Sequence, residues 1–319
     1  MNNTPSTEER VWAVLSHLSA LSFGMGLLLP IVGWSELRRK SKYASFQCLQ
    51  ALGYQSLGYT VWLLSYFVLM IVFFIMMVIL ISVMGDGGGN FGAFMGVWTT
   101  VFMIIIFGTF GAYFLLPVIA AISCAFGRDF RYPVMGSRLA RYLGYDPTKP
   151  SDEQTWLIED HEDRWVSAMG HFSVIIPLWG ILAPLTTWIL QGRHNLFLRF
   201  QSVQTLTYQG LVNVLYMGAG VIYMFGFVIF IVLTGFESGL DGTSPTGMIG
   251  LVALIASMLF AMFIVLLLPL LHILGQWVGY RVLKGDNYRY PLVGKLVERW
   301  TKTLLPSPSS AAGTPPSAS

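Results

Sequence analysis

The sequence predicts an all-α integral membrane protein built from two tandem copies of one unit. Hydrophobic residues make up 55% of the 319 residues and charged residues only 11%, whereas a soluble domain carries about 25% charged residues. Four uncharged runs, at 52–84, 93–126, 205–235 and 247–280, each exceed the ~20 residues that a helix needs to cross a bilayer. Residues 8–55 also recur as residues 162–209 at a constant offset of 154, with fifteen identical residues.

The repeat divides the chain into five parts. A polar tail (1–7) precedes membrane repeat 1 (8–145), a polar linker (146–161) leads to membrane repeat 2 (162–305), and a Pro/Ser/Ala-rich tail (306–319) is expected to be disordered. Each repeat is expected to contain a broken or re-entrant apolar hairpin and two long transmembrane helices. Strands of a barrel are not expected, because they would alternate polar and apolar residues.

The first apolar segment of each repeat is predicted to be two short helices joined by a bend. Ser6 and Glu9 have the spacing of a capping box, so the first helix should start near Thr7. Helix breakers then interrupt the segments 11–34 and 165–190 in their middle parts: Gly24, Gly26 and Pro30 in the first copy, and Pro177, Gly180 and Pro184 in the second.

The second helix of each repeat is predicted to begin at Phe46 or Phe200. In repeat 1 it would run to Met84 and measure roughly 58 Å, which is longer than a bilayer. Its first two turns are therefore expected at or beyond the cytoplasmic interface.

The distribution of basic residues predicts the topology. All 19 Lys and Arg residues lie in five places, and none lies in the loops 85–92 and 235–246. If the first segment of each repeat crossed the membrane once, these residues would divide almost evenly between the two sides. If it is re-entrant, all of them fall on one side, as the positive-inside rule favours. We therefore expect four crossings, both termini in the cytoplasm, and two parallel repeats related by a pseudo-two-fold axis along the membrane normal.

A set of polar residues repeats on the second helix and in the hairpins. Gln47, Gln50 and Tyr54 share one helical face. Such residues either bond to the hairpin backbone or line a polar cleft that receives a substrate or a partner segment. The paired histidines either hold the hairpin in place, respond to pH or relay protons, or ligate haem or a metal. The candidate cleft comprises His17, Gln47, Gln50, Tyr54, Gln55, His171, Gln201, Gln204, Tyr208 and Gln209.

A second group is predicted to contact lipid headgroups or the membrane interface. Trp34 and Trp188 end the hairpins near basic loops, where indole anchors are common. A shared Arg-Tyr-Pro motif ends each repeat, and is either a headgroup clamp or a structural corner. An amphipathic helix follows Pro291 and is expected to lie on the anionic leaflet. The remaining members of the group are Arg131, Tyr132, Arg289, Tyr290, Lys295, Arg299, Trp300 and Lys302.

Catalytic constellations are missing from the sequence. It has no HExxH, GxSxG or Walker lysine, and its two cysteines, Cys48 and Cys124, belong to no CxxC pair and are expected in the core. We therefore expect no enzyme activity, no metal and no cofactor, and no nucleic-acid partner.

The order Glu-x-Arg, His-Leu-Ser, Trp, Phe-Gln-x-x-Gln and Tyr-Gln, closed by Phe-Arg-Tyr-Pro, resembles the Tic-twenty-like bacterial membrane family, relatives of the chloroplast inner-envelope import subunit. The resemblance covers residues 8–139 and 162–297. It implies a non-enzymatic protein of the bacterial cytoplasmic (plasma) membrane that acts as a scaffold or as a protein translocation or insertion subunit, with the lipid bilayer and other membrane proteins as partners. It also implies that single-copy relatives work as dimers.

Two alternative functions stay open at the level of sequence. One is a small-molecule or lipid transporter with a polar site between the two repeats. The other is a haem-binding redox subunit that would use the paired histidines.

Overall fold

The computed structural model describes residues 4–84, 89–148, 156–235 and 244–303, and these residues form helices and short connections without a strand. Repeat 1 contains α1 (Thr7–Leu18), the 3-10 segment η1 (Ser19–Leu27), α2 (Leu28–Leu37), α3 (Lys42–Met84), α4 (Gly89–Ala125) and α5 (Met135–Leu143). Repeat 2 has the same order: α6 (Glu159–Phe172), η3 (Ser173–Ile175), α7 (Leu182–Gln191), α8 (Leu196–Gly235), α9 (Pro245–Leu283) and α10 (Val293–Thr303). The predicted all-helical tandem duplication is confirmed.

Four helices are long and apolar enough to cross a membrane, as the sequence predicts. They are α3, α4, α8 and α9, and at 37 to 43 residues each measures roughly 55–65 Å. α3 and α8 begin four residues earlier than expected. Ser41 accepts a hydrogen bond from the Ala44 N–H, and Asn195 accepts one from the Leu198 N–H, so a capping side chain starts each helix before the phenylalanine.

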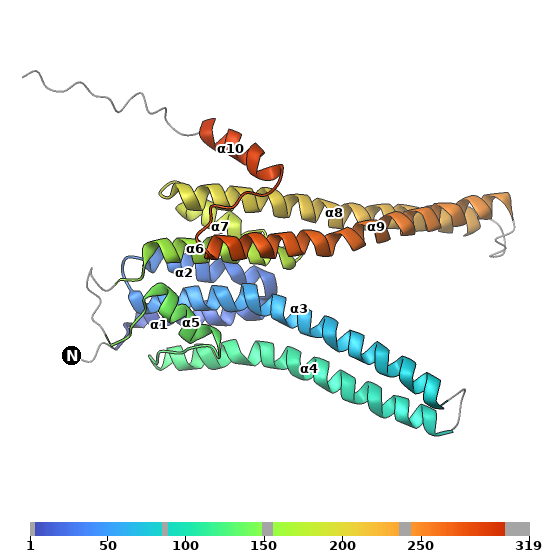
Figure 1. Cartoon of the computed structure of the whole chain (residues 1–319), viewed down its shortest axis with the longest axis horizontal. Helices are drawn as coiled ribbons and strands as arrows, with labels where there is room; N and C mark the ends of the chain where they lie inside the picture. Colours follow the sequence, from blue (N-terminus) through green and yellow to red (C-terminus); the bar gives the residue numbers. More distant parts are fainter. Residues whose placement is uncertain (1–3, 85–88, 149–155, 236–243, 304–319) are drawn as a thin grey trace, which may run out of the picture.

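The long helices form two hairpins that leave a common base (Figure 1). α3 pairs with α4 and α8 with α9, and both hairpins project from the same end of the molecule in the same direction. The short helices α1, α2, α5, α6 and α7 gather in the base. The two repeats are therefore the same way up.

The short hairpins at the base have the predicted bend. The capping box of Ser6 and Glu9 is present at the start of α1. α2 then returns along α1, and Gly33 comes so close to Trp12 and Cys48 that an added Cβ would lie 2.9 and 2.8 Å from their side chains. In repeat 2 the bend is made after η3, where Leu178 has a positive φ of 63° directly behind Pro177.

Some boundaries differ from those expected from the sequence, and some expectations fall outside the described residues. α6 begins at Glu159, inside the stretch 146–161 predicted as linker, and its first turn holds Glu159, Asp160 and Glu162, which the helix dipole favours there. The loop residues 85–88 and 236–243 and the tail 306–319 lie outside the described part of the chain.

The two long hairpins are packed differently. In the second hairpin, an added Cβ on Gly226 would lie 1.9 Å from Ser257 Oγ and 2.4 Å from its Cβ, so α8 and α9 touch closely there. No such close contact is found at Gly96, Gly108 or Gly111 of α4, where no heavy atom lies within 4 Å of an added Cβ. Gly210, Gly218 and Gly220 of α8 are equally open, so the close approach is confined to the part of the second hairpin around Gly226. The first hairpin is held instead by rings, such as Phe73 and Phe102 at a centroid distance of 4.3 Å.

Gly226→Ala should destabilise the α8–α9 hairpin. The new methyl group overlaps the Ser257 Cβ, which cannot rotate away, and such overpacking costs about 1–3 kcal/mol. The measurement is the thermal unfolding midpoint of the purified protein in detergent. Gly218→Ala is the matched control on the same helix, because nothing lies within 4 Å of that position. Equal midpoints for the two variants would contradict this packing.

Candidate functional site

The polar residues of repeat 1 form a closed, buried cluster between α1, α3 and the segment that follows α4. The Gln47 carbonyl oxygen accepts hydrogen bonds from His17 Nε2 (3.1 Å) and from the Gln50 amide (3.2 Å). The Gln50 carbonyl oxygen accepts from the Tyr132 backbone N–H at 2.9 Å. Both glutamine amides donate to the Phe130 carbonyl at 3.0 to 3.1 Å. We call this group polar cluster 1.

Repeat 2 reproduces the arrangement as polar cluster 2. Gln201 accepts from His171 Nε2 at 3.0 Å and from Gln204 at 3.2 Å. Gln204 in turn accepts from the Tyr290 N–H at 2.9 Å. Two substitutions separate the clusters. The Gln47 amide also donates to the Asp129 carboxylate, whereas the Gln201 amide donates to the Asn287 carbonyl oxygen. In cluster 2 the hydroxyl of Thr205, whose equivalent is Ala51, also lies 2.9 Å from His171 Nδ1.

The hydrogen bonds specify the tautomer of the two histidines. A glutamine carbonyl can only accept, so Nε2 of His17 carries the proton. Its Nδ1 then accepts from the Tyr132 hydroxyl at 3.0 Å, and His171 accepts from Tyr290 in the same way. Both ring nitrogens are thus engaged with protein groups. This geometry presents no free imidazole nitrogen to an iron atom.

Each cluster also fixes a long helix to the broken hairpin. The Gln55 amide donates to the Ser16 carbonyl and to the Ser19 hydroxyl, at the point where α1 ends. Gln209 binds Gly170 and Ser173 in the same manner. These bonds satisfy carbonyl groups that a helix end leaves without a partner.

The Arg-Tyr-Pro motif forms a structural corner. The ring of Tyr132 stacks on that of Tyr54 at a centroid distance of 4.1 Å, and its hydroxyl points to His17. Val134 follows with a positive φ of 65°, and the Met135 N–H bonds back to the Pro133 carbonyl. Tyr290, Pro291 and Leu292 repeat this turn.

The glycine that follows each corner has no room for a side chain. An added Cβ on Gly136 would lie 2.5 Å from the Gln50 carbonyl oxygen, and one on Gly294 would lie 2.8 Å from that of Gln204. The sequence Tyr-Pro-x-x-Gly therefore lets the glutamine reach the tyrosine N–H.

The structure brings all ten residues of the predicted polar cleft together, but as two buried clusters rather than an open cleft. Within the described part of the chain the carbonyl oxygens of Gln55 and Gln209 have no hydrogen-bond partner. Eight of them, the histidines and glutamines, are at most 3% exposed, and each bonds to other protein groups. Tyr54 and Tyr208 cover the corner tyrosines and donate to the backbone carbonyls of Tyr113 and Leu271.

Three residues predicted at the membrane interface lie inside the protein. Trp34, Tyr132 and Tyr290 are 0%, 3% and 2% exposed. Tyr132 and Tyr290 are buried because their hydroxyls donate hydrogen bonds to the buried histidines. Trp34 is buried because repeat 2 covers it. For these residues the prediction of lipid contact is wrong.

The other predicted interface residues are accessible. Trp188 is 41% and Trp300 is 55% exposed. Arg131 pairs with Asp129, and Arg289 pairs with Glu298 at 2.9 Å. Lys295 and Arg299 are exposed on α10, and the side chain of Lys302 lies outside the described part of the structure.

The two repeats meet in a joint centred on a buried arginine. Arg38 donates to Glu162 (3.2 Å) and forms an ion pair with Asp163 (2.5 Å), and all three side chains are at most 7% exposed. Trp34 donates its indole N–H to Glu162 at 3.1 Å, and the indole of Trp165 donates to the Leu49 carbonyl at 2.9 Å. Sequence comparison of the repeats missed this centre, because Arg38 corresponds to Gly192 in the second copy.

The contacts across the joint are not reciprocal. A two-fold axis would place Glu8 against Trp188, just as Glu162 lies against Trp34. Instead Glu8 and Trp188 are both exposed. α6 of repeat 2 packs on α3 of repeat 1, whereas no comparable contact joins α1 to α8 among the described residues. Of the equivalent helices that the structure describes, only α2 and α7 make such a contact with each other, as a two-fold axis would require. The expected pseudo-two-fold relation is wrong, and the joint is of the head-to-tail type.

The joint also perturbs its acidic groups. Burial raises the pKa of Glu162 to about 7, against the lowering effect of Arg38, and burial raises the pKa of Asp163 as well. Glu159, which lies at the surface and pairs with Arg39, instead has a lowered pKa. The buried guanidinium of Arg38 thus pairs with two carboxylates whose ionised forms are disfavoured by burial.

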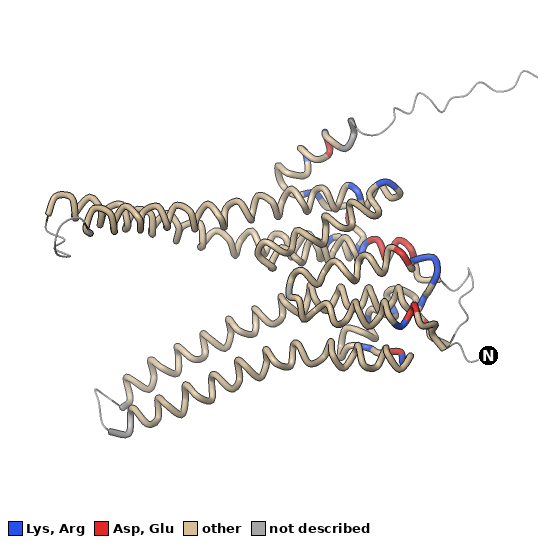
Figure 2. Tube along the Cα trace, turned by 180° about the vertical axis from the view of Figure 1, so that it is seen from behind, with Lys and Arg blue, Asp and Glu red and all other residues tan. Residues whose placement is uncertain are grey.

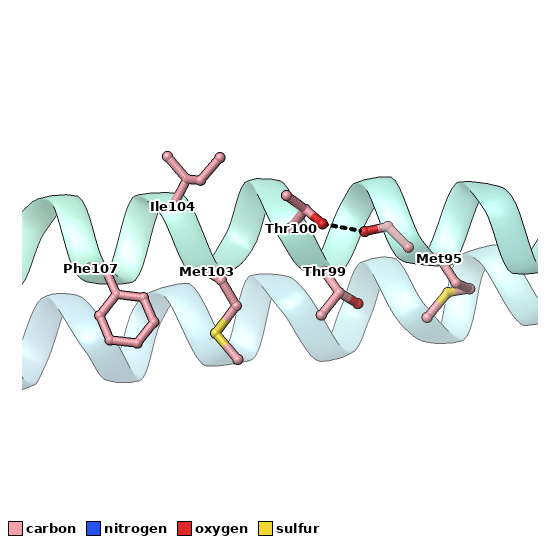
Figure 3. Close-up of a pocket in the computed structure, with 7 residues that line it drawn as sticks. Met95, Thr99, Thr100, Met103, Ile104 and Phe107 are labelled. Carbon is pink, nitrogen blue, oxygen red and sulfur yellow. Dashed lines mark hydrogen bonds between the residues drawn. The ribbon is translucent and has the colours of Figure 1, made fainter.

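A groove of about 600 Å³ lies on the outer face of α4, away from both clusters (Figure 3). Met95, Thr99, Met103, Ile104 and Phe107 line it, and the Thr100 hydroxyl bonds to the Gly96 carbonyl of its own helix. Ile104 and Phe107 are 65% and 68% exposed. The groove is an apolar surface on a spanning helix and suits contact with acyl chains.

Comparison with known families now identifies the chain. The sequence profile of the magnetosome magnetite crystal formation protein family (MamF/MmsF) matches residues 8–139 and, a second time, residues 162–297. The chain belongs to this family. Each match covers one broken hairpin, two long helices and the corner motif. No curated protein and no solved structure matched the chain.

The family match corrects the resemblance inferred from the sequence. The same two stretches carry the motif, but they identify a member of the magnetosome family and not a Tic-twenty-like protein. The residues of the motif are those that build the clusters and corners, so they report the fold of the unit. The predicted role in protein translocation rested on that resemblance alone and is therefore not supported.

Glu162→Gln should flatten the pH dependence of stability. The folded protein holds a proton on Glu162 up to about pH 7, whereas the unfolded chain releases it near 4.5. Stability therefore falls as the pH rises from about 4.5 to 7, by at most about 1.4 kcal/mol per pH unit from this group. The measurement is the unfolding midpoint in detergent from pH 5 to 8. Glu8→Gln, the equivalent exposed residue, is the control and should keep the wild-type slope. An unchanged slope in Glu162→Gln would refute this assignment.

Proposed function

We propose that this magnetosome-family protein is a non-enzymatic membrane scaffold that supports magnetite crystal formation. The single observation that carries the proposal is that the family profile covers both membrane repeats. Four apolar helices support a place in the membrane. The polar residues of both repeats bond to each other and to the backbone, which supports a structural role for them.

The charge distribution supports one orientation in the membrane. The described Lys and Arg residues lie at the base or on α10, and the described far parts of both long hairpins carry no charged residue (Figure 2). With the base in the cytoplasm, both termini are cytoplasmic and the two hairpins cross to the opposite side. In a membrane that encloses a crystal, the side opposite the cytoplasm is the side that faces the crystal.

Exposed apolar side chains support shallow insertion of the short hairpins. At the bend of repeat 1, Leu21 and Met25 are 46% and 48% exposed, and at the bend of repeat 2 Leu178 and Trp179 are 49% and 46% exposed. Re-entrant hairpins that return to the cytoplasmic side place these side chains among lipid chains. The broken backbone at each bend is covered by Gln55 and Gln209, as lipid surroundings require.

α10 is proposed to lie on the cytoplasmic leaflet. Leu296 and Trp300 are 42% and 55% exposed on one side, and Lys295 and Arg299 are exposed as well. This combination fits a helix that lies on an anionic membrane surface. The lipid bilayer and other membrane proteins of the compartment are the partners that this arrangement favours.

Deletion of the gene in a magnetosome-forming bacterium should change the crystals. Under the scaffold role, crystals should be smaller or fewer while iron uptake by the cell is unchanged. The measurements are crystal size distributions by electron microscopy and total cell iron. The gene for Gly218→Ala should restore wild-type crystals, whereas Arg38→Met, which leaves two buried carboxylates without their partner, should not. Wild-type crystals in the deletion strain would contradict the proposed role.

Cysteine labelling should confirm the orientation. In intact isolated magnetosomes the cytoplasmic side faces the buffer. A membrane-impermeant maleimide should therefore label Arg39→Cys and Arg193→Cys, and should label Asp86→Cys and Asp241→Cys only after detergent is added. The native cysteines are buried and give a low background. Labelling of Arg39→Cys with protection of Arg193→Cys would mean that the repeats have opposite orientations.

A further inference from the structure

The joint between the repeats uses a different face of each unit. Repeat 1 contributes α2 and α3, with Trp34, Arg38 and Leu49. Repeat 2 contributes α6, with Glu162 and Trp165, and the end of α7, which packs on α2. Because the units are homologous, each also carries the face that its partner uses. Repeat 1 therefore has a second, unused face on α1, and repeat 2 has one on α8 and on the side of α7 that carries Trp188.

The α1 face and the α7 part of the other face are exposed, and Val203 and Thr207 on α8 are partly exposed. Trp165 and Met169 of α6 are 7% and 0% exposed, but the equivalent Val11 and Leu15 of α1 are 49% and 41% exposed. Trp34 is fully buried, but the equivalent Trp188 is 41% exposed. Ile189, which corresponds to Ser35, is 62% exposed, although Ser35 itself accepts a hydrogen bond from Gln191 across the joint.

We propose that these two open faces bind each other between chains, so that the protein associates head to tail through a copy of its internal joint. The α1 face of one chain would occupy the α7–α8 face of a second copy of the same chain. Heterologous contacts of this kind produce a ring if the rotation between units closes, and an open row if it does not. All units would keep the same orientation in the membrane.

Part of the polar chemistry of the internal joint is retained on the open faces. Glu8 is identical to Glu162, and Trp188 is identical to Trp34, so the indole–carboxylate pair can form again. Arg38 has no counterpart, but Arg39 does: it pairs with Glu159 and lies within electrostatic reach of Glu162 and Asp163. Its equivalent, Arg193, is exposed, and Glu8 and Glu9 stand where Glu162 and Asp163 stand in the second copy.

The apolar surfaces are complementary in size. In the internal joint the ring of Trp165 fills the space over Gly53, and an added Cβ there would lie 2.3 Å from the ring. On the open faces Gly53 is replaced by the larger Thr207, and Trp165 is replaced by the smaller Val11. The residue on the α8 side has thus become larger and the residue on the α1 side smaller. Such opposite changes in volume are expected if the two residues still pack against each other.

Cross-linking between differently tagged chains tests the proposal. A chain with Val11→Cys is expressed together with a chain with Val203→Cys, and the membranes are treated with a short bismaleimide. These two positions correspond to Trp165 and Leu49, which touch across the internal joint. We expect a mixed dimer only when both variants are present. The control pair is Ile104→Cys with Leu266→Cys, at 65% and 66% exposed positions away from the faces, and should stay uncross-linked.

Two results would overturn the proposal. A dimer from Val11→Cys chains alone would show a two-fold contact, and monomers in every mixture would show that lipid covers both faces. Neither result would contradict the proposed role in crystal formation, which the deletion strain tests separately.

A size exchange provides a second, independent test. Val11→Trp alone should clash with Thr207 and raise the apparent dissociation constant roughly tenfold, the cost of one overpacked contact. Adding Thr207→Gly should restore association, because the pair then copies Trp165 over Gly53. The measurement is the mass distribution of the chain in nanodiscs as a function of concentration. Equal effects of Val11→Trp with and without Thr207→Gly would refute the contact.

Discussion

The structure depends on one constraint: polar side chains in an apolar protein must find partners inside it. Gln47 and Gln50 meet this constraint by joining three segments that are distant in the sequence, namely α1 through His17, α3 itself, and the corner through Tyr132. Leaving one of these buried groups without a partner costs about 1–3 kcal/mol. The position of the corner, and with it the direction in which the long hairpin leaves the base, is therefore set by a few hydrogen bonds, and both repeats set it in the same way.

The joint differs from the clusters, because it is held by a buried ion pair, whereas the clusters consist of neutral groups apart from Asp129 in cluster 1. Removing one member of a buried ion pair is strongly destabilising, so Arg38 specifies how repeat 2 sits on repeat 1 more than it stabilises either repeat. The equivalent Gly192 cannot do the same. This substitution, together with the differences between Gly53 and Thr207 and between Trp165 and Val11, turns two similar units into a directional pair with one closed contact and two open faces.

The sequence predicts what depends on periodicity and repetition. The four long helices follow from apolar length, the bends from proline and glycine, and the meeting of the glutamines and histidines from their equivalent positions in both copies. It does not reveal Tyr132 as a partner of His17, because 115 residues separate them, nor Arg38, which occurs in only one copy. The sequence resemblance indicated the wrong family for a related reason. The shared motif builds the clusters and corners, and residues with such a structural role can be similar in families that differ in function.

Fusion of two units changes the energetics of association. The linker makes the internal joint intramolecular, and its high effective concentration would hold even a modest contact closed. Yet this joint carries the buried arginine and the Trp165–Gly53 contact, whereas the equivalents of these three residues are Gly192, Val11 and Thr207. The stronger version of the contact is thus found where covalent linkage already favours it, and the weaker version where chains would meet. A strong joint inside the chain fixes the relative rotation of its two units, and a weak one between chains lets an assembly form and rearrange while a crystal grows.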